Sequence, residues 1–387
     1  MEHAAVILGS ATPSLESWHN AATGKYRLAT MKKRWDENIM LPSVQIVDMK
    51  LERDDDDRIP AFSKQLRDAI QIRLMKTEQT ILFLNKRGYS RQLQCSACGY
   101  VPSCDECSMP YTYHKHTESM ICHLCGNTIR AMAQCPQCGG TELKYIGSGT
   151  ERIELQTAKL FPHAKISRMD SDTMTSANAY EKVLSEFRRG NIDILIGTQM
   201  IAKGLDFPNV TLVGVLNADM GLFTPDFRAH ERTFQLLAQV AGRAGRSERG
   251  GEVIIQTYSP ANPAILCAQR HSCQAFFDEE LPIRKDMDLP PYFRYWLLHF
   301  EGEDEKEIES NANALIERIR QAFPEIDISD VIPSFFEKIR NKHRYCATLR
   351  CKNEPALRHM LRHELNQWKS RVRNVSFYLD VDALFLL

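Results

Sequence analysis

Eight of the twelve cysteines fall in one stretch of the chain, as four pairs with the spacing Cys-x-x-Cys. The pairs are Cys95/Cys98, Cys104/Cys107, Cys122/Cys125 and Cys135/Cys138. A turn of this type presents two thiolates to one ion, and structural Zn²⁺ takes four such ligands in a tetrahedral arrangement. The eight cysteines therefore predict two structural zinc ions per chain. Because four thiolates leave no open coordination position, this zinc is not expected to do hydrolytic chemistry.

The four pairs can combine sequentially (first with second, third with fourth) or in a nested order (first with fourth, second with third). Five residues separate the first pair from the second, and fourteen separate the second from the third. The longer spacing is close to that of a zinc ribbon, which favours nesting and leaves sequential pairing as the alternative. His114, His116 and His123 are further candidate ligands, but eight thiolates make them unnecessary.

A second group of candidate residues follows a helix-like segment that begins at Glu231, and it reads Gln239-Val240-Ala241-Gly242-Arg243-Ala244-Gly245-Arg246. Arg243 and Arg246 are three residues apart, so on a helix they share one face. The planar, permanently charged guanidinium group is suited to contacting the oxygens of a transferred phosphoryl group. The segment therefore indicates a nucleotide contact, and the alternative is a basic helix end at the surface.

Two strand-like runs end in small polar residues. The run at 194–196 continues into Gly197-Thr198-Gln199-Met200-Ile201-Ala202-Lys203-Gly204-Leu205-Asp206, and the run at 4–8 continues into Gly9-Ser10-Ala11-Thr12-Pro13. In open α/β sheets, ligands bind beyond the carboxyl ends of the strands, which makes both loops candidate contacts. Each could alternatively be a turn, and hydroxyl residues before proline are also common at helix starts.

The elements that must position these residues alternate between strand-like and helix-like segments. Short apolar runs, typical of strands buried on both faces, occur at Val6–Leu8, Ile81–Leu84, Ile192–Ile196, Val210–Leu216 and Val253–Gln256. Between them, apolar residues repeat at helical spacing within 62–74 and 180–187. The alternation predicts an α/β domain, with a parallel sheet covered by helices on both faces.

Two stretches interrupt this pattern. The Cys-rich stretch 90–147 has few apolar residues and no regular period, so we expect an insertion that metal holds together. After Leu281, strand-like runs at 295–300, 345–350 and 375–381 alternate with helix-like segments at 304–321 and 354–369, and a further strand is possible near 327–332. This order predicts a separate, small α+β domain.

Composition excludes several classes of protein. The chain has 387 residues, of which 43% are hydrophobic and 25% charged, which is too apolar for a largely disordered chain. It contains no apolar run long enough to span a membrane and no export signal at its first residues, so we expect a cytoplasmic protein without a membrane partner. A long chain of this kind does not fit a disulfide scaffold either.

The net charge of zero conceals an uneven distribution. Residues 301–330 contain ten acidic and three basic residues, whereas residues 338–373 contain eleven basic and two acidic ones. Arg340, Lys342 and Arg344 alternate, so in an extended strand they would share one face and could contact DNA phosphates. The alternative is a solvated basic face that balances the acidic helix.

Together these motifs resemble those of superfamily 2 helicases. Ser10-Ala11-Thr12, Gly197–Gly204 and Gln239–Arg246 are similar to motifs III, V and VI of that superfamily, in the same order. The Cys-rich insertion narrows the resemblance to the bacterial replication-restart helicases, the PriA family. Two further segments support it: Phe83-Leu84-Asn85-Lys86-Arg87-Gly88-Tyr89 and Pro225-Asp226-Phe227-Arg228-Ala229 followed by Glu231-Arg232.

The resemblance implies a RecA-like motor that uses ATP and Mg²⁺ to move 3′ to 5′ on DNA. It implies that Gly204, Asp206 and Gln239 lie near the nucleotide, and that Arg243 and Arg246 act on its phosphates, with Arg246 as the arginine finger. Thr198 would lie nearer DNA, and Ser10 and Thr12 would couple the state of ATP to the other lobe. The family also implies nested zinc sites, with forked and single-stranded DNA, single-stranded-DNA-binding protein and other primosome proteins as partners.

The sequence departs from the family in having no G-x-x-x-x-G-K-[ST] phosphate loop and no acidic Mg²⁺-binding motif. We therefore expect the C-terminal portion of a helicase that restarts stalled replication, inactive as an ATPase by itself. The expected division is 1–57 as the end of the first lobe and a linker, 58–282 as the second lobe with its zinc insertion at 90–147, and 283–387 as a DNA-binding domain. The alternative is a non-catalytic, zinc-stabilised scaffold that binds nucleic acid.

Overall fold

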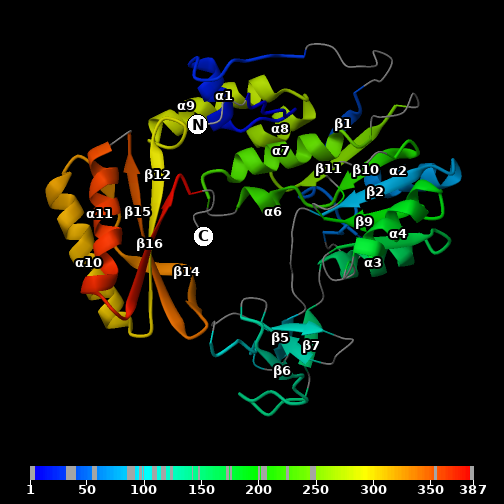
Figure 1. The fold of residues 1–387 in the computed structure, drawn as a ribbon. Helices are drawn as coiled ribbons and strands as arrows, with labels where there is room; N and C mark the ends of the chain where they lie inside the picture. Colours follow the sequence, from blue (N-terminus) through cyan, green and yellow to red (C-terminus); the bar gives the residue numbers. More distant parts are fainter. Residues whose placement is uncertain are drawn as a thin grey trace. The chain divides into compact units, whose positions relative to one another are not determined.

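The chain forms two compact units in a computed structural model, residues 1–88 with 148–281 and residues 89–147 with 282–387. Figure 1 shows the fold. The structure describes residues 5–31, 41–54, 59–84, 92–95, 98, 100–106, 111–114, 119–122, 125–141, 143–146, 149–170, 174, 177–198, 201, 207–223, 226–244, 250–352 and 355–383.

A parallel six-stranded sheet forms the centre of the first unit. Its order is β1-β11-β10-β2-β9-β8. The strands are β1 (Ser43–Asp48), β2 (Gln79–Phe83), β8 (Ile166–Met169), β9 (Ile194–Gly197), β10 (Val210–Val215) and β11 (Glu252–Thr257). Every residue of β2, β9 and β10 is buried, as expected for strands covered on both faces. The predicted α/β architecture is therefore confirmed.

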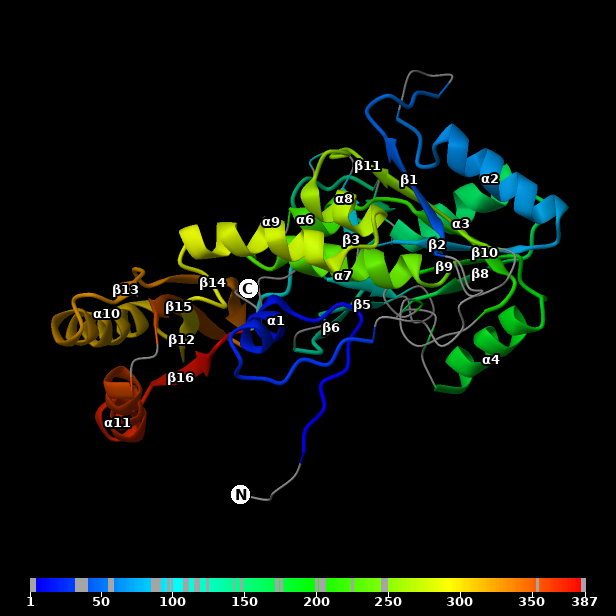
Figure 2. The same cartoon turned by 90° about the horizontal axis from the view of Figure 1, so that it is seen from above.

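Helices cover both faces of this sheet (Figures 1 and 2). The helices are α1 (Leu15–Ala22), α2 (Lys64–Met75), α3 (Gly149–Leu160), α4 (Ala177–Arg188), α6 (Asp219–Leu222), α7 (Ala229–Ala241), α8 (Pro263–Gln269) and α9 (Cys273–Asp286). Successive strand residues point to opposite faces, so Leu82 packs in the core beneath α2 and α3 while Ile81 packs in the core beneath α4, α7 and α8.

Helix α2 shows how the sequence produces this packing. The Ser63 side chain caps the helix by accepting a hydrogen bond from the backbone N–H of Leu66, at 3.2 Å. Leu66, Ala69 and Ile70 then recur at helical spacing and form the buried face. The apolar period thus decides which side of α2 meets the sheet.

One predicted strand is wrong. Residues 5–10 have no regular secondary structure, and the side chains of Val6, Ile7 and Leu8 are 81%, 91% and 69% exposed. A parallel strand needs a hydrogen-bonding neighbour, and the sheet edge beside β11 is taken by β1. Strand β1 therefore belongs to the same sheet as the strands β2 and β8–β11. The expected domain division at residue 57 stays a prediction.

The Cys-rich insertion in the second unit consists of short antiparallel strands. Strands β3 (Gln92–Cys95) and β7 (Leu143–Ile146) pair with each other, and β4 (Thr112–His114), β5 (Ser119–Ile121) and β6 (Thr128–Arg130) form a three-stranded sheet. Its described apolar cluster has five buried residues, Leu93, Cys104, Tyr111, Met120 and Cys122. A core of this size needs additional stabilisation, which metal ligation supplies in small modules.

Residues 294–381 form the predicted α+β domain. The strands are β12 (Arg294–Gly302), β13 (Asp327–Ile328), β14 (Ile332–Ile339), β15 (Lys342–Cys351) and β16 (Val375–Val381), in the order β13-β15-β12-β16 with β14 also paired to β15. Helices α10 (Glu305–Ala322) and α11 (Pro355–Arg371) pack on the sheet through a core that includes Trp296, Phe300 and Trp368. The long strand β14 was not predicted beyond its first residue.

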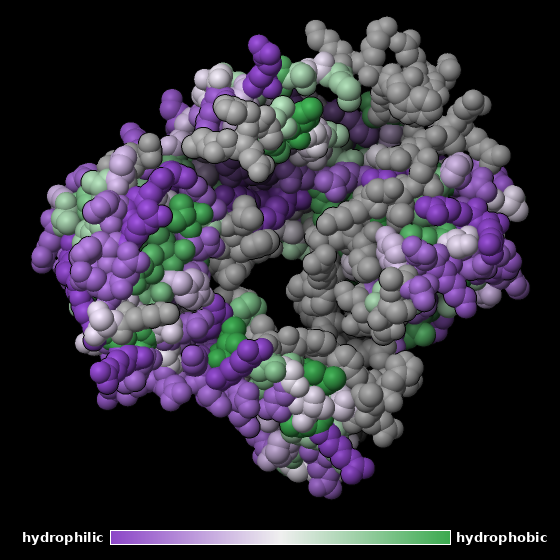
Figure 3. Space-filling view, in the orientation of Figure 1, coloured by the Kyte–Doolittle hydropathy of each residue, from purple (hydrophilic) through white to green (hydrophobic). Residues whose placement is uncertain are grey.

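The described surface is predominantly polar on the face that Figure 3 shows, with separate, small hydrophobic patches. No helix in the described part of the chain is long and apolar enough to cross a membrane.

We predict that Gly197→Ala destabilises the first unit. A Cβ atom at Gly197 would lie 2.5 Å from the carbonyl oxygen of Met169 on the adjacent strand β8. Forcing apart a packed core costs about 1–3 kcal/mol, which urea denaturation would measure. Gly9→Ala is the matched control, because nothing lies within 4 Å of its added methyl group. Equal stability of both variants would contradict the packing described for β8 and β9.

Candidate functional site

The first and fourth cysteine pairs lie together. The sulfur atoms of Cys95, Cys98, Cys135 and Cys138 all lie within 4.8 Å of one another. The distances from Cys95 Sγ to Cys138 Sγ and from Cys98 Sγ to Cys135 Sγ are both 3.6 Å. Tetrahedral zinc with bonds of about 2.3 Å places its sulfur ligands about 3.8 Å apart. The donor set and its spacing therefore fit one zinc ion.

The second and third pairs form the other cluster. Cys104, Cys122 and Cys125 lie within the same limit of one another, and Cys104 Sγ is 3.7 Å from Cys125 Sγ. The eighth cysteine, Cys107, lies outside the described residues. First with fourth and second with third is the nested order, so that preference is confirmed for the seven described cysteines.

Backbone turns present the sulfur atoms of the third and fourth pairs. In the fourth pair, Cys135 N–H donates to Gly140 O at 2.8 Å, and Gly139 has a φ of 70°. The third pair repeats this geometry, with Gly126 at a φ of 82°. Positive φ is strained for most residues, which explains why a glycine directly follows the second cysteine of both the third and the fourth pair.

Polar groups surround the cysteine sulfurs. The backbone N–H of Asn127 donates to Cys125 Sγ at 3.4 Å. Burial, and then a hydrogen bond with Cys104, raise the pKa of the Tyr111 hydroxyl. At Cys98, a backbone hydrogen bond from Tyr100 lowers the pKa, but burial and the neighbouring thiols raise it to about 12. Four crowded thiols lose their protons to solvent readily only when a metal ion binds the thiolates, and bound zinc would supply a fixed tetrahedral crosslink.

The turn of the β14–β15 hairpin lies against the second cysteine cluster. Ile339 packs on the core that contains Cys104 and Cys122. Lys338 Nζ donates to Asp105 O at 3.1 Å, and the backbone N–H of Asn341 donates to Glu106 O at 3.0 Å. The segment Cys104–Glu106 therefore contributes a cluster cysteine, Cys104, and also anchors the hairpin through Asp105 and Glu106.

The predicted nucleotide-facing residues are described only in part. Gln239 is exposed near the end of α7, and Arg243 is half-buried just beyond it. Gly204, Asp206 and Arg246 lie outside the described residues. At Gly251 the chain passes so close to the backbone of Ala244 that a Cβ atom has no room, so Ala244 lies beside the start of β11.

Thr198 and Arg243 are at opposite edges of the sheet. Thr198 is buried and directly follows β9, so it lies at the carboxyl edge. Arg243 lies between α7 and the first residue of β11, at the amino edge of the same parallel sheet. The two residues therefore lie far apart along the strand direction, and their expected roles stay predictions.

Sequence reasoning missed a polar connection between α7 and the segment that contains Ser10 and Thr12. Glu231 is only 4% exposed, and its carboxylate accepts a hydrogen bond from the backbone N–H of Leu15 at 3.0 Å. Gln235 Nε2 donates to Thr12 O at 3.3 Å. Two polar residues four apart on α7 were the available signal, but their partners are more than two hundred residues away in sequence. Ser10 itself is exposed and Thr12 half-buried.

The prediction that Arg340, Lys342 and Arg344 share the face of one strand is wrong. Arg340 and Asn341 have φ angles of 50° and 62° and form the turn between β14 and β15. Two-residue hairpin turns have positive φ at both central residues, so the chain reverses there. Arg344 Nε also donates to Glu301 at 3.1 Å, which partly neutralises its charge.

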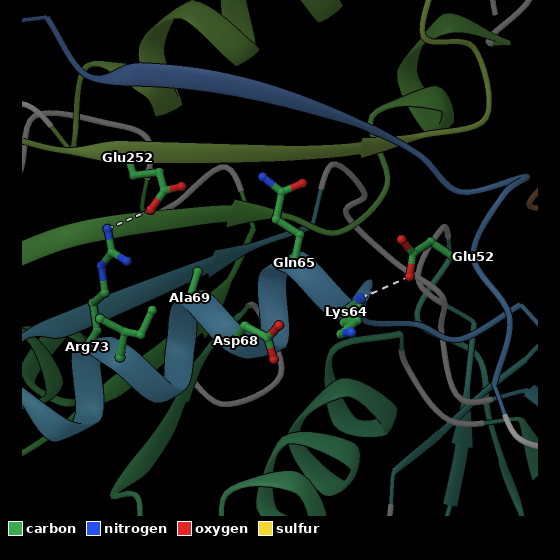
Figure 4. A pocket seen from close by; sticks show the side chains of 8 residues that line it. Glu52, Lys64, Gln65, Asp68, Ala69, Arg73 and Glu252 are labelled. Carbon is green, nitrogen blue, oxygen red and sulfur yellow. Dashed lines mark hydrogen bonds and ion pairs between the residues drawn. The ribbon is translucent and has the colours of Figure 1, made fainter.

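A charged pocket of about 490 Å³ lies beside α2, at the edge of the first unit's sheet (Figure 4). It is lined by Glu52, Lys64, Gln65, Asp68, Ala69, Ile72, Arg73 and Glu252. None of these is a predicted site residue. Arg73 and Glu252 form an ion pair of 2.6 Å, so these two charges of the pocket neutralise each other.

Three family models match separate parts of the chain. The helicase conserved C-terminal domain matches residues 145–248, the PriA DNA helicase Cys-rich region domain matches 104–130, and the primosomal protein N C-terminal domain matches 285–384. With the parallel sheet and the cysteine clusters, they define a helicase C-terminal domain that contains a zinc-binding Cys-rich region.

Curated relatives narrow this class. The replication restart protein PriA of Bacillus subtilis is 40% identical over 378 residues, covering 97% of this chain and 47% of the relative. That of Chlamydia pneumoniae is 38% identical over 390 residues (99% and 51%), and that of Treponema pallidum is 37% identical over 382 residues (98% and 57%). The chain belongs to the PriA family and matches the C-terminal part of these proteins. It spans about half the length of the curated relatives it matches.

We predict that Cys122→Ser removes one of two zinc ions and also loosens the β14–β15 hairpin. Losing a ligand of the second cluster releases the loop that holds the Asn341 amide. Elemental analysis would count the zinc, and hydrogen exchange at Asn341 should accelerate by about tenfold or more. Cys135→Ser is the control, because it removes zinc from the first cluster while Asn341 stays protected. Equal acceleration in both variants would disprove the specific coupling.

We also predict that Glu231→Ala lowers the free energy of unfolding of the first unit by about 1–3 kcal/mol, because the buried N–H of Leu15 loses its acceptor. Gln239→Ala shortens an exposed side chain on the same helix and serves as the control. Chemical denaturation of both variants measures the difference. A Glu231 variant as stable as the control would show that this hydrogen bond contributes nothing.

Proposed function

We propose that this chain is the C-terminal portion of an ATP-dependent 3′–5′ DNA helicase that binds forked DNA and restarts stalled replication by primosome assembly. The observation that supports it most is the match of nearly the whole chain to replication restart proteins, at 40% identity for one of them. The order of the three motif-like segments along the chain supports the same reading.

The proposal gives each group of residues one task. Arg243 and Arg246 stabilise charge on the transferred phosphoryl group, since guanidinium groups at that position act on developing negative charge. Gln239, Gly204 and Asp206 contact the nucleotide, and the groups that hold its phosphates and Mg²⁺ belong to the other lobe. Thr198 contacts DNA from the carboxyl edge of the sheet.

The connection between α7 and residues 12–16 suggests how the two ends of the motor communicate. Helix α7 ends at the predicted nucleotide-facing residues and holds the Ser10–Thr12 segment through Glu231 and Gln235. A rigid helix that contacts both sites would transmit a displacement from one to the other. In this proposal, Ser10 and Thr12 couple the nucleotide state to the first lobe.

The proposal includes single-stranded-DNA-binding protein and other primosome proteins as partners, with the cytoplasm as the compartment. The zinc module offers a small, metal-stabilised surface for such contacts. We propose that it holds two structural zinc ions, on the evidence of the nested clusters.

We predict that the 387-residue chain alone hydrolyses ATP at no more than a trace rate, because its sequence contains no phosphate-binding loop. Joined to a lobe that supplies this loop, it should become a DNA-stimulated ATPase. In that context Arg246→Ala and Arg243→Ala should each lower kcat by roughly 10³-fold or more, as for other arginine fingers. Arg189→Ala, an exposed arginine paired with Glu186, is the control.

The same assay separates the proposal from the alternative. An ATPase that depends on both arginines supports the helicase, whereas DNA binding without ATPase in any joined form would favour a zinc-stabilised scaffold. Sequencing the DNA upstream of the codon for Met1 adds an independent test. An in-frame extension or adjacent reading frame that contains a G-x-x-x-x-G-K-[ST] motif and an acidic motif would support the helicase, and its absence would support the scaffold.

A further inference from the structure

Helix α11 in the second unit presents an unusual concentration of positive charge on its exposed side. Arg358 and Arg362 are four residues apart and both exposed, and His359 and His363 form a second exposed pair beside them. With about 3.6 residues per turn, residues four apart lie next to each other on one face. The result is a stripe of basic and imidazole side chains along the outer face of α11.

The acidic residue of α11 cannot neutralise this stripe. Glu364 is the only acidic residue in the helix, and it is just 7% exposed. Its carboxylate already pairs with Arg318 of α10, at 3.0 Å, and with Arg371, at 3.2 Å. Within the described residues, neither Arg358 nor Arg362 makes a hydrogen bond or an ion pair with another side chain, while Glu354 lies outside them.

The stripe is unfavourable for the helix that contains it. Like charges four residues apart repel each other, and Arg358 lies in the first turn, where the helix dipole disfavours cations. The opposite face is well packed, since Leu357, Leu361 and Trp368 are buried in the domain core. Folding therefore explains the buried face of α11 but gives no reason for the two exposed arginines.

We propose that this stripe, Arg358, His359, Arg362 and His363, binds the phosphate backbone of DNA. Two guanidinium groups on adjacent turns match consecutive negative charges, and the imidazole of His359 can add a hydrogen-bond donor for a phosphate oxygen. The His363 Nε2 atom lies 2.8 Å from Gln367 Nε2, from which it accepts a hydrogen bond, so that Nδ1 is its remaining donor position. The contact is independent of sequence, because phosphates carry no base information. The inference rests on the proposed function and specifies which surface of residues 283–387 meets DNA.

The adjacent helix supplies the contrast within the same domain. Helix α10 has Glu305 and Glu307 in its first turn, and further glutamates at 309 and 317. Its basic residues include Lys306, which is exposed, and Arg320, which is paired with Glu317 and Asp330. A polyanion is repelled by α10 and attracted by α11, so contact through α11 is favoured. Hydrophilic side chains cover most of the left part of Figure 3, where both helices lie in Figure 1.

The test is the salt dependence of DNA binding by the zinc-loaded 387-residue chain, measured by fluorescence anisotropy with a duplex and with an oligothymidylate. Each phosphate contact contributes about 0.9 to the slope of log K against log salt on duplex and about 0.7 on single strands. The double variant Arg358→Ala/Arg362→Ala should lose about 1.8 units of slope if duplex is bound and about 1.4 units if a single strand is bound.

Two further variants control this measurement. Lys306→Ala/Arg320→Ala removes the same charge from α10 and should leave the slope unchanged. Arg358→Lys/Arg362→Lys keeps the charge on α11 and should retain the wild-type slope, which excludes misfolding as the cause of a loss. Circular dichroism of all three variants checks that the domain is folded.

Each other outcome overturns the inference. A wild-type slope in the α11 alanine variant would show that the stripe is a solvated face that does not contact DNA. If the chain still bound DNA in that case, the proposed function would be unaffected. Equal losses in the α10 and α11 variants would show a general effect of net charge. A wild-type chain that binds neither DNA would remove both this inference and the DNA-binding part of the proposed function.

Discussion

Hydrogen bonding along a parallel sheet that is buried on both faces determines where every motif of the first unit can lie. Strands β2, β9 and β10 have no exposed residue, so their backbone groups must pair with neighbouring strands. All six strands run in the same direction, so a return crossover must connect each strand to the next one along the chain. The crossovers place Thr198 at one edge and Arg243 at the other, and any function of these residues must use both edges.

The second unit is stabilised differently, because its Cys-rich insertion is too small to be held by apolar packing alone. Short strands and a small apolar cluster leave the cysteine clusters as the main crosslinks. The C-terminal domain also stabilises the insertion, since Ile339 of the β14–β15 hairpin packs against the apolar cluster of the insertion. Metal ligation and hairpin docking thus act on the same loop, between Cys104 and Cys107.

The sequence predicted those features that depend on local pattern. Unbroken Val, Ile and Leu runs predicted the central strands, because burial on both faces removes polar residues. Repeated Cys-x-x-Cys spacing predicted the clusters, because the turn itself defines the sulfur geometry. Three features depended on distant partners and were missed or predicted wrongly. Residues 5–8 have no neighbouring strand to pair with. The turn at Arg340–Asn341 contains no glycine that would have indicated it. Glu231 accepts its hydrogen bond from Leu15, which is 216 residues away in sequence.

The charges of the C-terminal domain divide into those that folding explains and those that it does not. Asp304 caps α10 through the backbone N–H of Lys306, and Glu305 and Glu307 in its first turn complement the helix dipole. Arg318 and Arg371 satisfy the buried Glu364. These charges stabilise the helices that contain them. Arg358 and Arg362 oppose the stability of α11, and a polyanion on that face would reverse the sign of their contribution. The charges of α10 are therefore paired or aligned with its dipole within the domain, whereas the proposed contact of α11 with DNA would relieve the repulsion between its two arginines.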